Sequence, residues 1–176
     1  ENQLPSFKIA GTPVRSNLPG IHNVYNILAA VAIARYRADE MRSEIIIEKG
    51  ITFIIDCYNA NPVSMKYALD TLAKMECKGR RIAVLGDMLE LGGHSEMYHR
   101  QIGAYASERG IDSVFCNGPS AGIIAKSFGE GAYHFHEQEM LAGRLLKEIV
   151  KGDIVLFKGS RGMALENIAN RVMGSL

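Results

Sequence analysis

The segment Asp56–Pro62, with the sequence DCYNANP, concentrates polar side chains directly after an apolar run. It offers a carboxylate, a phenol and two amides, and Tyr58, Asn59 and Asn61 are the groups best suited to hydrogen-bond a ligand. Asn61 and Pro62 are also residue types favoured at the cap and first turn of a helix. A ligand-binding loop and a turn with a helix cap both fit this segment, although its density of polar groups exceeds what a cap needs.

Two further polar segments follow apolar runs in the same way. Asp87 comes after RIAVLG, where a carboxylate can accept hydrogen bonds from ribose hydroxyls or can simply cap the next helix. Lys158, Ser160 and Arg161 follow DIVLF in the string KGSRG. Their donors suit a carboxylate or a phosphate near a helix N-terminus, and a solvated basic turn is the alternative.

A pair of amides in the N-terminal part forms a fourth candidate. Asn23 and Asn26, in the string HNVYN, are three residues apart and would share one face of a helix. An amide has donors and an acceptor, so it can hydrogen-bond the N6 and N7 edge of adenine. A capping pair at the start of a helix fits the same spacing equally well.

Several well-known catalytic and metal-binding motifs are absent from the sequence. It has no GxxxxGK[ST] phosphate loop, no GxGxxG fingerprint and no GxSxG elbow. His134 and His136 would share one face of a strand, but no cysteine or carboxylate completes a metal set beside them, so we expect no metal site there.

Composition and charge narrow the function classes. Of the 176 residues 47% are hydrophobic, which is enough to bury a core and excludes a wholly disordered chain. Lys and Arg number 20 against 19 Asp and Glu, so no nucleic-acid or membrane-surface patch is indicated. Apolar runs are shorter than the about 20 residues that a membrane helix needs. The cysteines Cys57, Cys77 and Cys116 are far apart and odd in number, which favours a reducing compartment such as the cytoplasm.

The elements that must position these polar segments alternate along the chain. Short apolar, β-branched runs predict strands at Ile51–Asp56, Arg81–Gly86, Ser113–Asn117, Ala132–His136 and Asp153–Lys158. Amphipathic stretches predict helices at about 62–76, 95–109, 119–128, 138–149 and 162–173. Continuous apolar strands alternating with helices indicate an α/β fold, a Rossmann-like and mostly parallel sheet with helices on both faces. Ligands of such sheets bind outside the carboxyl ends of the strands, where the polar segments lie.

The first 41 residues follow a different pattern. Gly11–Gly20 contains Pro13 and Pro19 and is predicted to be a loop, and 21–37 is predicted to be a helix. A short charged stretch then precedes the first regular strand. We expect residues 1–41 to be the remnant of a preceding domain with a linker, and 42–176 to form the Rossmann-like domain.

Four strings, in this order, resemble segments of the ATP-dependent Mur ligases of cell-wall synthesis. They are LPGIHNVYNILAA, DCYNANPVSM, RRIAVLGDMLELG and VLFKGSRGMALE, and together they extend over residues 18–166. Within the family they are most similar to the member that joins D-Ala-D-Ala to UDP-N-acetylmuramoyl-tripeptide. The resemblance implies a monomeric three-domain enzyme of the bacterial cytoplasm. That enzyme uses MgATP to form an acyl phosphate, which the dipeptide amine then attacks, and this chain would hold the end of the central ATPase domain and the C-terminal domain.

The resemblance also implies roles for individual residues on the nucleotide side. Asn23 and Asn26 match a pair that contacts adenine, and Asp87 matches a ribose-binding aspartate. Arg42 matches an arginine that reaches the ATP phosphates when the domains close, a role that suits an always-charged, forked guanidinium. Tyr58 and Asn59 would line the nucleotide side of the cleft.

The substrate side is implied by the same resemblance. Lys158, Ser160 and Arg161 would face the peptide substrates, most plausibly a carboxylate, and we group Asn61 with them. The family's phosphate loop, carbamylated lysine and Mg²⁺ ligands belong to the central domain and have no match in this chain. Cys57 stands where a serine is expected, and the segment from Asn26 to Arg42 is shorter than the family pattern.

Three hypotheses follow from the sequence. The first is the C-terminal part of a D-Ala-D-Ala-adding Mur ligase, inactive as this piece alone because the phosphate loop is missing. The second is a non-catalytic module that binds a nucleotide or an amino acid. The third is another Mur ligase that adds a different amino acid.

Overall fold

The computed structural model describes residues 6–9, 12–15 and 44–176. The chain divides into two compact units, residues 1–40 and 41–176. In the first, β1 (Ser6–Ile9) and β2 (Thr12–Arg15) pair as an antiparallel ribbon. The predicted loop over Gly11–Gly20 is therefore wrong for β2. Pro13 is tolerated there because each strand of a two-stranded ribbon has an open edge.

The predicted helix at 21–37, with Asn23 and Asn26, lies outside the described residues, and so does Arg42.

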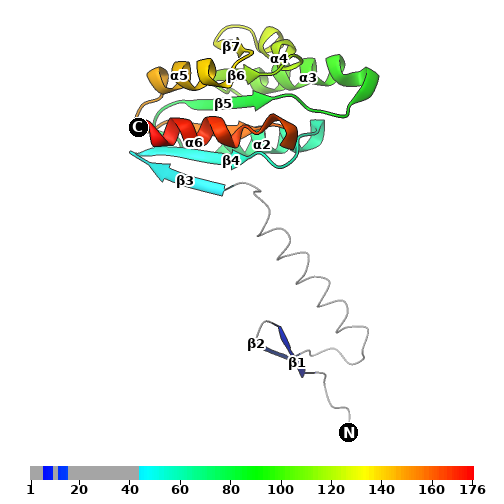
Figure 1. The fold of residues 1–176 in the computed structure, drawn as a ribbon, viewed down its shortest axis with the longest axis vertical. Coiled ribbons are helices and arrows are strands. Elements are labelled where there is room, and N and C mark those ends of the chain that lie inside the picture. Colours follow the sequence, from blue (N-terminus) through cyan, green and yellow to red (C-terminus); the bar gives the residue numbers. More distant parts are fainter. Residues whose placement is uncertain (1–5, 10–11, 16–43) are drawn as a thin grey trace. The chain divides into compact units, whose positions relative to one another are not determined.

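The second unit is built on one six-stranded sheet with the strand order β3-β4-β8-β5-β6-β7 (Figure 1). Its strands are β3 (Glu44–Glu48), β4 (Ile51–Asp56), β5 (Arg81–Gly86), β6 (Ser113–Asn117), β7 (Ala132–Phe135) and β8 (Ile154–Lys158). Only β3 runs antiparallel, to β4, and the other neighbours are parallel. The mostly parallel α/β sheet predicted from the sequence is confirmed.

The antiparallel strand β3 is the element of the sheet that the sequence analysis missed. Its apolar run is only Ile45–Ile47 between two glutamates, and Ile45 and Ile47 remain 57% and 70% exposed at the sheet edge. A two-residue turn at Lys49 and Gly50, with φ of 51° and 79°, connects it to β4. Both angles are left-handed, as in the tight hairpin turns that suit the twist of paired strands.

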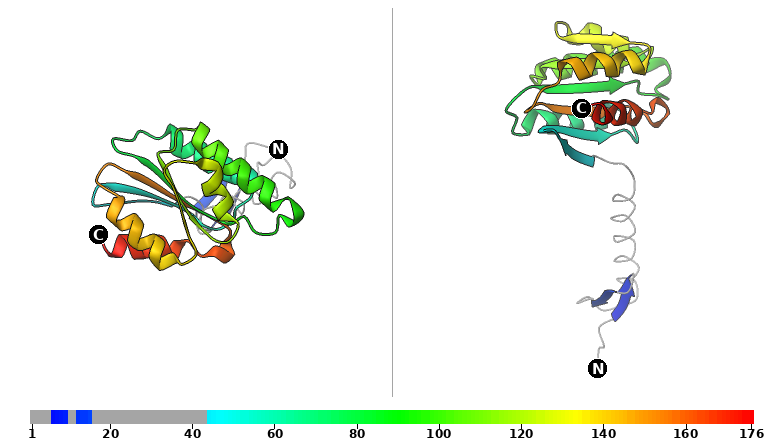
Figure 2. Two further views of the ribbon diagram at one scale, coloured as in Figure 1. Left: turned by 90° about the horizontal axis from the view of Figure 1, so that it is seen from above. Right: turned by 60° about the vertical axis from the view of Figure 1, so that its left-hand side comes forward.

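Helices cover both faces of this sheet (Figure 2). On one face lie α2 (Pro62–Lys74), α3 (Ser95–Glu108) and α4 (Ala121–Phe128), and on the other lie α5 (Gln138–Glu148) and α6 (Glu166–Gly174). Each face has its own buried apolar cluster, the first around Leu69, Leu85 and Ile102, and the second around Phe53, Phe157 and Leu145. This arrangement explains why the strands are apolar along their whole length, because successive side chains are buried in the clusters on opposite faces of the sheet.

The connections place a topological switch point at the central strands. β4 leads into α2 on one face, its neighbour β8 leads into α6 on the opposite face, and β5 on the far side of β8 leads into α3 on the first face. Loops that diverge to opposite faces leave a crevice outside the carboxyl ends of the strands, where open α/β sheets bind ligands.

Candidate functional site

The three polar segments of the second unit meet at this switch point. Asp56–Pro62 starts at the last residue of β4, Gly86–Gly92 at the last residue of β5 and Lys158–Gly162 at the last residue of β8, which lies between the other two strands. The juxtaposition that parallel pairing predicts is thus present. Hydrogen bonds and an ion pair connect the segment after β8 to each of its neighbours.

Lys158 joins the segments after β8 and β4. Its Nζ lies 2.9 Å from Asp56 Oδ2 and donates to the Asn59 backbone oxygen at 2.8 Å. The side chain of Lys158 is 2% exposed and that of Asp56 is 17% exposed. In this structure the ammonium therefore holds the DCYNANP loop against β8, and its charge is matched by a partly exposed carboxylate.

Ser160 joins the segments after β8 and β5. Its backbone N–H donates to the Asp87 backbone oxygen at 3.1 Å, and its Oγ accepts from the Leu89 N–H at 2.9 Å. Ser160 is 7% exposed. Because a hydroxyl that accepts one hydrogen bond still has a proton to donate, Ser160 keeps a donor while it ties the two loops together.

The Asp87 carboxylate caps α4. Oδ1 accepts from the Ala121 N–H at 2.6 Å and Oδ2 from the Ser120 N–H at 3.2 Å, with Asp87 itself 3% exposed. Gly118, at φ +119°, lets the chain pass so close that a Cβ there would lie 2.6 Å from Asp87 Oδ1. The cap is formed on α4 and not on α3, the next helix along the chain, which the sequence suggested. Each carboxylate oxygen retains a further acceptor position.

Asn61 and Arg161 are the exposed members of the predicted substrate-binding residues. Asn61 is exposed and caps α2, where its Oδ1 accepts from the Ser64 N–H at 2.9 Å and the Ser64 Oγ accepts from the Asn61 N–H at 3.0 Å. Arg161 is 58% exposed and lies 3.3 Å from Glu166 Oε1 at the start of α6. The predicted cap and first-turn roles of Asn61 and Pro62 are confirmed, and Arg161 presents the most accessible cation of the KGSRG segment.

A hollow of about 560 Å³ borders the DCYNANP loop. Its lining residues are Asn61, Pro62, Val63, Ser64, Tyr67, Leu91 and Tyr98. They come from the start of α2, the loop after β5 and α3. The carboxyl edge of the sheet therefore has a recess beside the polar segments.

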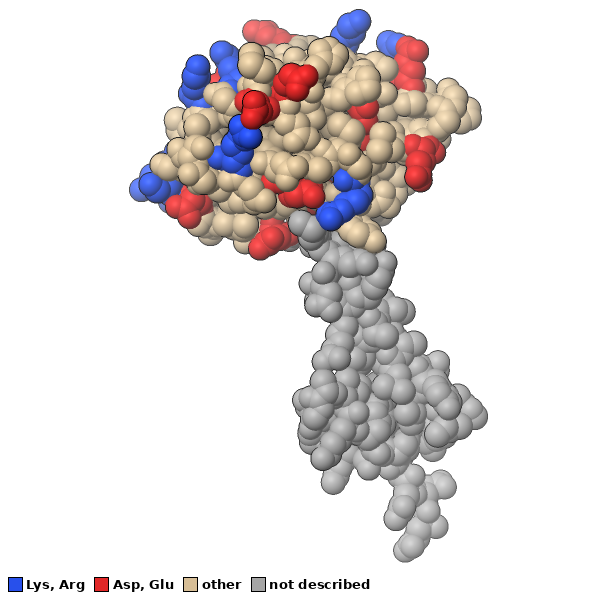
Figure 3. Space-filling view, in the orientation of Figure 1, with Lys and Arg blue, Asp and Glu red and all other residues tan. Residues whose placement is uncertain are grey.

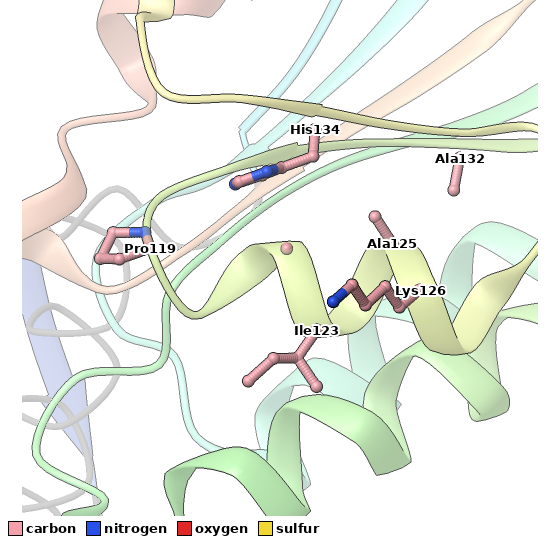
Figure 4. A pocket seen from close by; sticks show the side chains of 7 residues that line it. Pro119, Ile123, Ala125, Lys126, Ala132 and His134 are labelled. Carbon is pink, nitrogen blue, oxygen red and sulfur yellow. The ribbon is translucent and has the colours of Figure 1, made fainter.

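A second hollow, of about 460 Å³, lies between α4 and the edge strand β7 (Figure 4). Lys126 and His134 point toward it, and His134 Nε2 is hydrogen-bonded to the Gly118 oxygen at 2.8 Å. None of the predicted site residues lines this hollow. We therefore place the candidate site at the carboxyl ends of β4, β8 and β5.

Charge on the described residues is mixed in sign. Figure 3 shows acidic and basic side chains interspersed over the face that it presents. Among residues 44–176 and the two short strands before them, no group of three His, Cys, Asp or Glu residues could hold a metal ion. The same part of the chain has no helix with the length and apolar character needed to cross a membrane.

Comparison with known proteins identifies the family. Residues 41–161 match the model of the Mur ligase, glutamate ligase domain. This chain belongs to the Mur ligase family. The Bacillus subtilis UDP-N-acetylmuramoyl-tripeptide–D-alanyl-D-alanine ligase is 37% identical over 89% of this chain and 39% of its own length. The Escherichia coli protein of the same name is 35% identical over 86% of this chain and 37% of its own length.

Solved structures of Mur ligases share the fold. A MurF from Acinetobacter baumannii superposes with a TM-score of 0.73 at 28% identity over 93% of this chain and 40% of that chain. A MurF ligase from Thermotoga maritima in complex with ADP has a TM-score of 0.69 at 24% identity over 97% of this chain and 43% of that chain. The chain thus spans about two fifths of the length of these Mur ligase relatives.

His99 lies beside the candidate site, and the sequence analysis did not predict its contacts there. It is fully buried on α3, and its Nε2 accepts from the Met88 N–H at 3.0 Å in the loop after β5. A sequence signal was available, because residues 99, 102 and 106 share the inner face of the helix with apolar neighbours. A histidine on such a face needs a polar partner.

Cys57 and Cys116 are predicted to be unreactive in the folded Mur ligase domain. Burial raises the pKa of each thiol to about 12, and the carboxylates of Glu166 and Asp56 add to the rise at Cys57. At pH 8 we expect a thiol reagent to modify the half-buried Cys77 rapidly and the other two only after unfolding. Mass spectrometry of the labelled chain measures this. Rapid modification of Cys57 in the folded chain would contradict it.

The same shifts predict how stability depends on pH. Above pH 9 the unfolded thiols ionise while the folded ones stay neutral, so the free energy of unfolding should fall. The expected slope is up to about 1.4 kcal/mol per pH unit for each thiol between pH 9 and 12. Urea unfolding at pH 8 and pH 10 measures it, with the double variant C57A/C116A as the control that should lack this contribution.

Proposed function

We propose that this chain is the C-terminal part of the ligase that joins D-Ala-D-Ala to UDP-N-acetylmuramoyl-tripeptide in peptidoglycan synthesis. In that reaction a tripeptide carboxylate oxygen attacks the γ-phosphorus of ATP, which forms an acyl phosphate and releases ADP. The dipeptide amine then attacks the acyl carbon, loses a proton and displaces phosphate. The observation that carries the proposal is the meeting of the DCYNANP, GDMLELG and KGSRG segments at one switch point.

On the nucleotide side we propose that Asp87, Tyr58 and Asn59 take part in ATP binding. Each oxygen of the Asp87 carboxylate accepts one backbone N–H and has a further acceptor position. Ribose hydroxyls are donors, which supports this role for Asp87. Asn59 is exposed at the carboxyl end of β4. Asn23, Asn26 and Arg42, outside the described residues, are proposed to contact adenine and the phosphates.

Magnesium is proposed to be held mainly by the central domain of the whole protein. The described residues bring together no set of three metal-ligating side chains, so by themselves they do not fit a protein-held metal ion. When bound, Mg²⁺ neutralises charge on the phosphates. Residues 1–41 are proposed to be the end of that central domain and 42–176 the C-terminal domain.

On the substrate side we propose that Arg161 binds the carboxylate of the incoming dipeptide. Its guanidinium is accessible, always charged and able to form a bidentate pair. Ser160 follows β8 and Asn61 follows the neighbouring strand β4, and both are proposed to contact the peptide. Lys158 is proposed to act on the substrate through the loop that it holds, because its Nζ is engaged by Asp56 and Asn59.

We expect Arg161→Ala in the whole enzyme to raise the Michaelis constant for D-Ala-D-Ala by about tenfold, the loss that follows from removing one charge-assisted carboxylate contact. Arg100→Ala is the matched control, since Arg100 is an exposed arginine paired with Glu96 on α3. Steady-state kinetics with varied dipeptide measures both. Equal Michaelis constants for Arg161→Ala and the parent would remove Arg161 from the dipeptide site.

An amide-resolved NMR titration of this chain tests whether the crevice itself binds ligands. MgATP should shift resonances in the segments after β4 and β5, and D-Ala-D-Ala should shift those in the segment after β8. Shifts confined to the hollow beside His134 would place the ligands elsewhere. A well-dispersed spectrum that does not respond would withdraw these residue assignments while leaving the family membership unchanged.

The whole protein is proposed to be a monomer of the bacterial cytoplasm, without nucleic-acid partners and without insertion in a membrane. The family membership and the mixed surface charge support this proposal.

A further inference from the structure

We propose that His99 is a positioning residue of this site, which holds the Asp87–Leu89 loop in the conformation that receives the nucleotide. This inference rests on the proposed function and adds a residue that contacts no ligand itself. His99 would act through a single hydrogen bond, from the Met88 N–H to its Nε2.

The hydrogen bonds of the imidazole define its protonation state. Nδ1 lies 2.7 Å from the Ser95 carbonyl oxygen, which can only accept, so Nδ1 carries the proton. Nε2 lies 3.0 Å from the Met88 nitrogen, which can only donate, so Nε2 is unprotonated. His99 is therefore a neutral ring in one tautomer, and it is fully buried between α3 and the loop.

The loop that His99 holds is tied down from three directions. His99 on α3 accepts the Met88 N–H, Ser160 after β8 accepts the Leu89 N–H, and the Asp87 carboxylate reaches the start of α4. These anchors come from separate elements around the carboxyl edge of the sheet. The loop then turns through Glu90, whose φ of +66° is left-handed, a conformation that persists only when the surroundings impose it.

The anchors also determine what the loop can offer a ligand. The amides of Met88 and Leu89 are both occupied by side chains, so they are unavailable to cradle a phosphate. What remains for recognition is the Asp87 carboxylate, whose position depends on its own backbone. Loss of the His99 acceptor would leave a buried N–H unsatisfied and would release the residue next to Asp87.

The test uses the isotope-labelled 176-residue chain with two substitutions at one position. His99→Gln keeps an acceptor at similar reach, whereas His99→Leu fills space without one. His94→Leu is the matched control, since His94 is an exposed histidine just before α3 that contacts Tyr98. The measurements are the ring nitrogen shifts of His99, hydrogen exchange of the Met88 amide, and the MgATP dissociation constant from the Asp87–Leu89 amides.

We expect the unsubstituted ring to show a protonated Nδ1 and a bare Nε2. His99→Leu should speed exchange of the Met88 amide by about tenfold beyond any change in global unfolding, and it should weaken MgATP binding by about tenfold. His99→Gln and His94→Leu should change each by less than about threefold. Rescue by glutamine is what separates an acceptor from a residue that merely fills the core.

Three results would overturn the inference. The first is a protonated Nε2. The second is an equal loss of Met88 amide protection and of MgATP affinity in His99→Gln and His99→Leu. The third is an unsubstituted chain whose loop amides do not respond to MgATP, which would detach His99 from ligand binding. The exchange of the Met88 amide is measured without ligand, so failure of the proposed ligase function would leave that result standing and would be recognised separately.

Discussion

Replacing Asp56 with alanine is expected to lower the free energy of unfolding of this chain by about 3 kcal/mol. Asp56 is the counter-ion of Lys158, whose side chain is only 2% exposed and whose Nζ lies 2.9 Å from the carboxylate. Without Asp56 the ammonium keeps the Asn59 backbone oxygen as an acceptor but loses its opposite charge. An unpaired charge in that position costs far more than the pair itself contributes.

A double-mutant cycle makes this expectation specific. Lys158→Met in the Asp56→Ala background should restore at least half of the lost stability, because it removes the charge that was left uncompensated. Urea unfolding of the four proteins measures the coupling between the two positions. Additive losses, with the double variant less stable than either single variant, would show that the two residues do not act as a pair.

Asp153 lies at the opposite, amino edge of the sheet. Replacing it with alanine is expected to lower the free energy of unfolding by about 3 kcal/mol. The Asp153 side chain is fully buried before β8 and accepts from the Arg80 N–H at 2.8 Å, the Val150 N–H at 3.0 Å and Arg80 Nη2 at 2.8 Å. Through the last of these bonds it raises the pKa of Arg80 above its ordinary value. Its removal leaves two backbone donors without their acceptor, and the Arg80 guanidinium keeps the Glu148 backbone oxygen but loses its counter-ion.

Glu96→Ala is the control for this substitution. Glu96 pairs with Arg100 at 2.6 Å, but both side chains are more than 60% exposed, so the expected loss is about 0.5 kcal/mol or less. The loss of stability in Asp153→Asn should lie between those of Asp153→Ala and Glu96→Ala, since asparagine keeps one carbonyl acceptor. Urea unfolding midpoints compare all three, and equal losses for Asp153→Ala and Glu96→Ala would contradict the account of this buried carboxylate.

The elements that sequence patterns predicted best are those whose signal is local. The strands at 51–56, 81–86 and 113–117 were predicted with the bounds that the structure has, because each is a short apolar run that ends in a polar residue or glycine. The last helix begins at Glu166 instead of 162, because Arg161–Met163 form a 3₁₀ turn and Ala164 is left-handed. No local pattern marks that turn.

The site was predictable in its location but not in its internal contacts. The carboxyl ends of parallel strands lie at the same edge of a sheet, so polar segments that follow neighbouring strands come together there. By contrast, buried Lys158 donates to a backbone oxygen 99 residues away in the sequence. Asp87 caps a helix by accepting from amides that are 33 and 34 residues away. Such partners follow from tertiary packing, so the sequence could indicate a charged or polar group but not which group it would meet.

The proposed function is tested most directly by a chimera in which residues 41–176 replace the matching part of the Bacillus subtilis ligase. We expect phosphate release that requires UDP-N-acetylmuramoyl-tripeptide, MgATP and D-Ala-D-Ala together, and none from the 176-residue chain alone. Glutamate, alanine or diaminopimelate should not replace the dipeptide. A folded chimera that turns over with one of those amino acids instead, or ATP turnover by the chain alone that survives repurification, would contradict the proposed function.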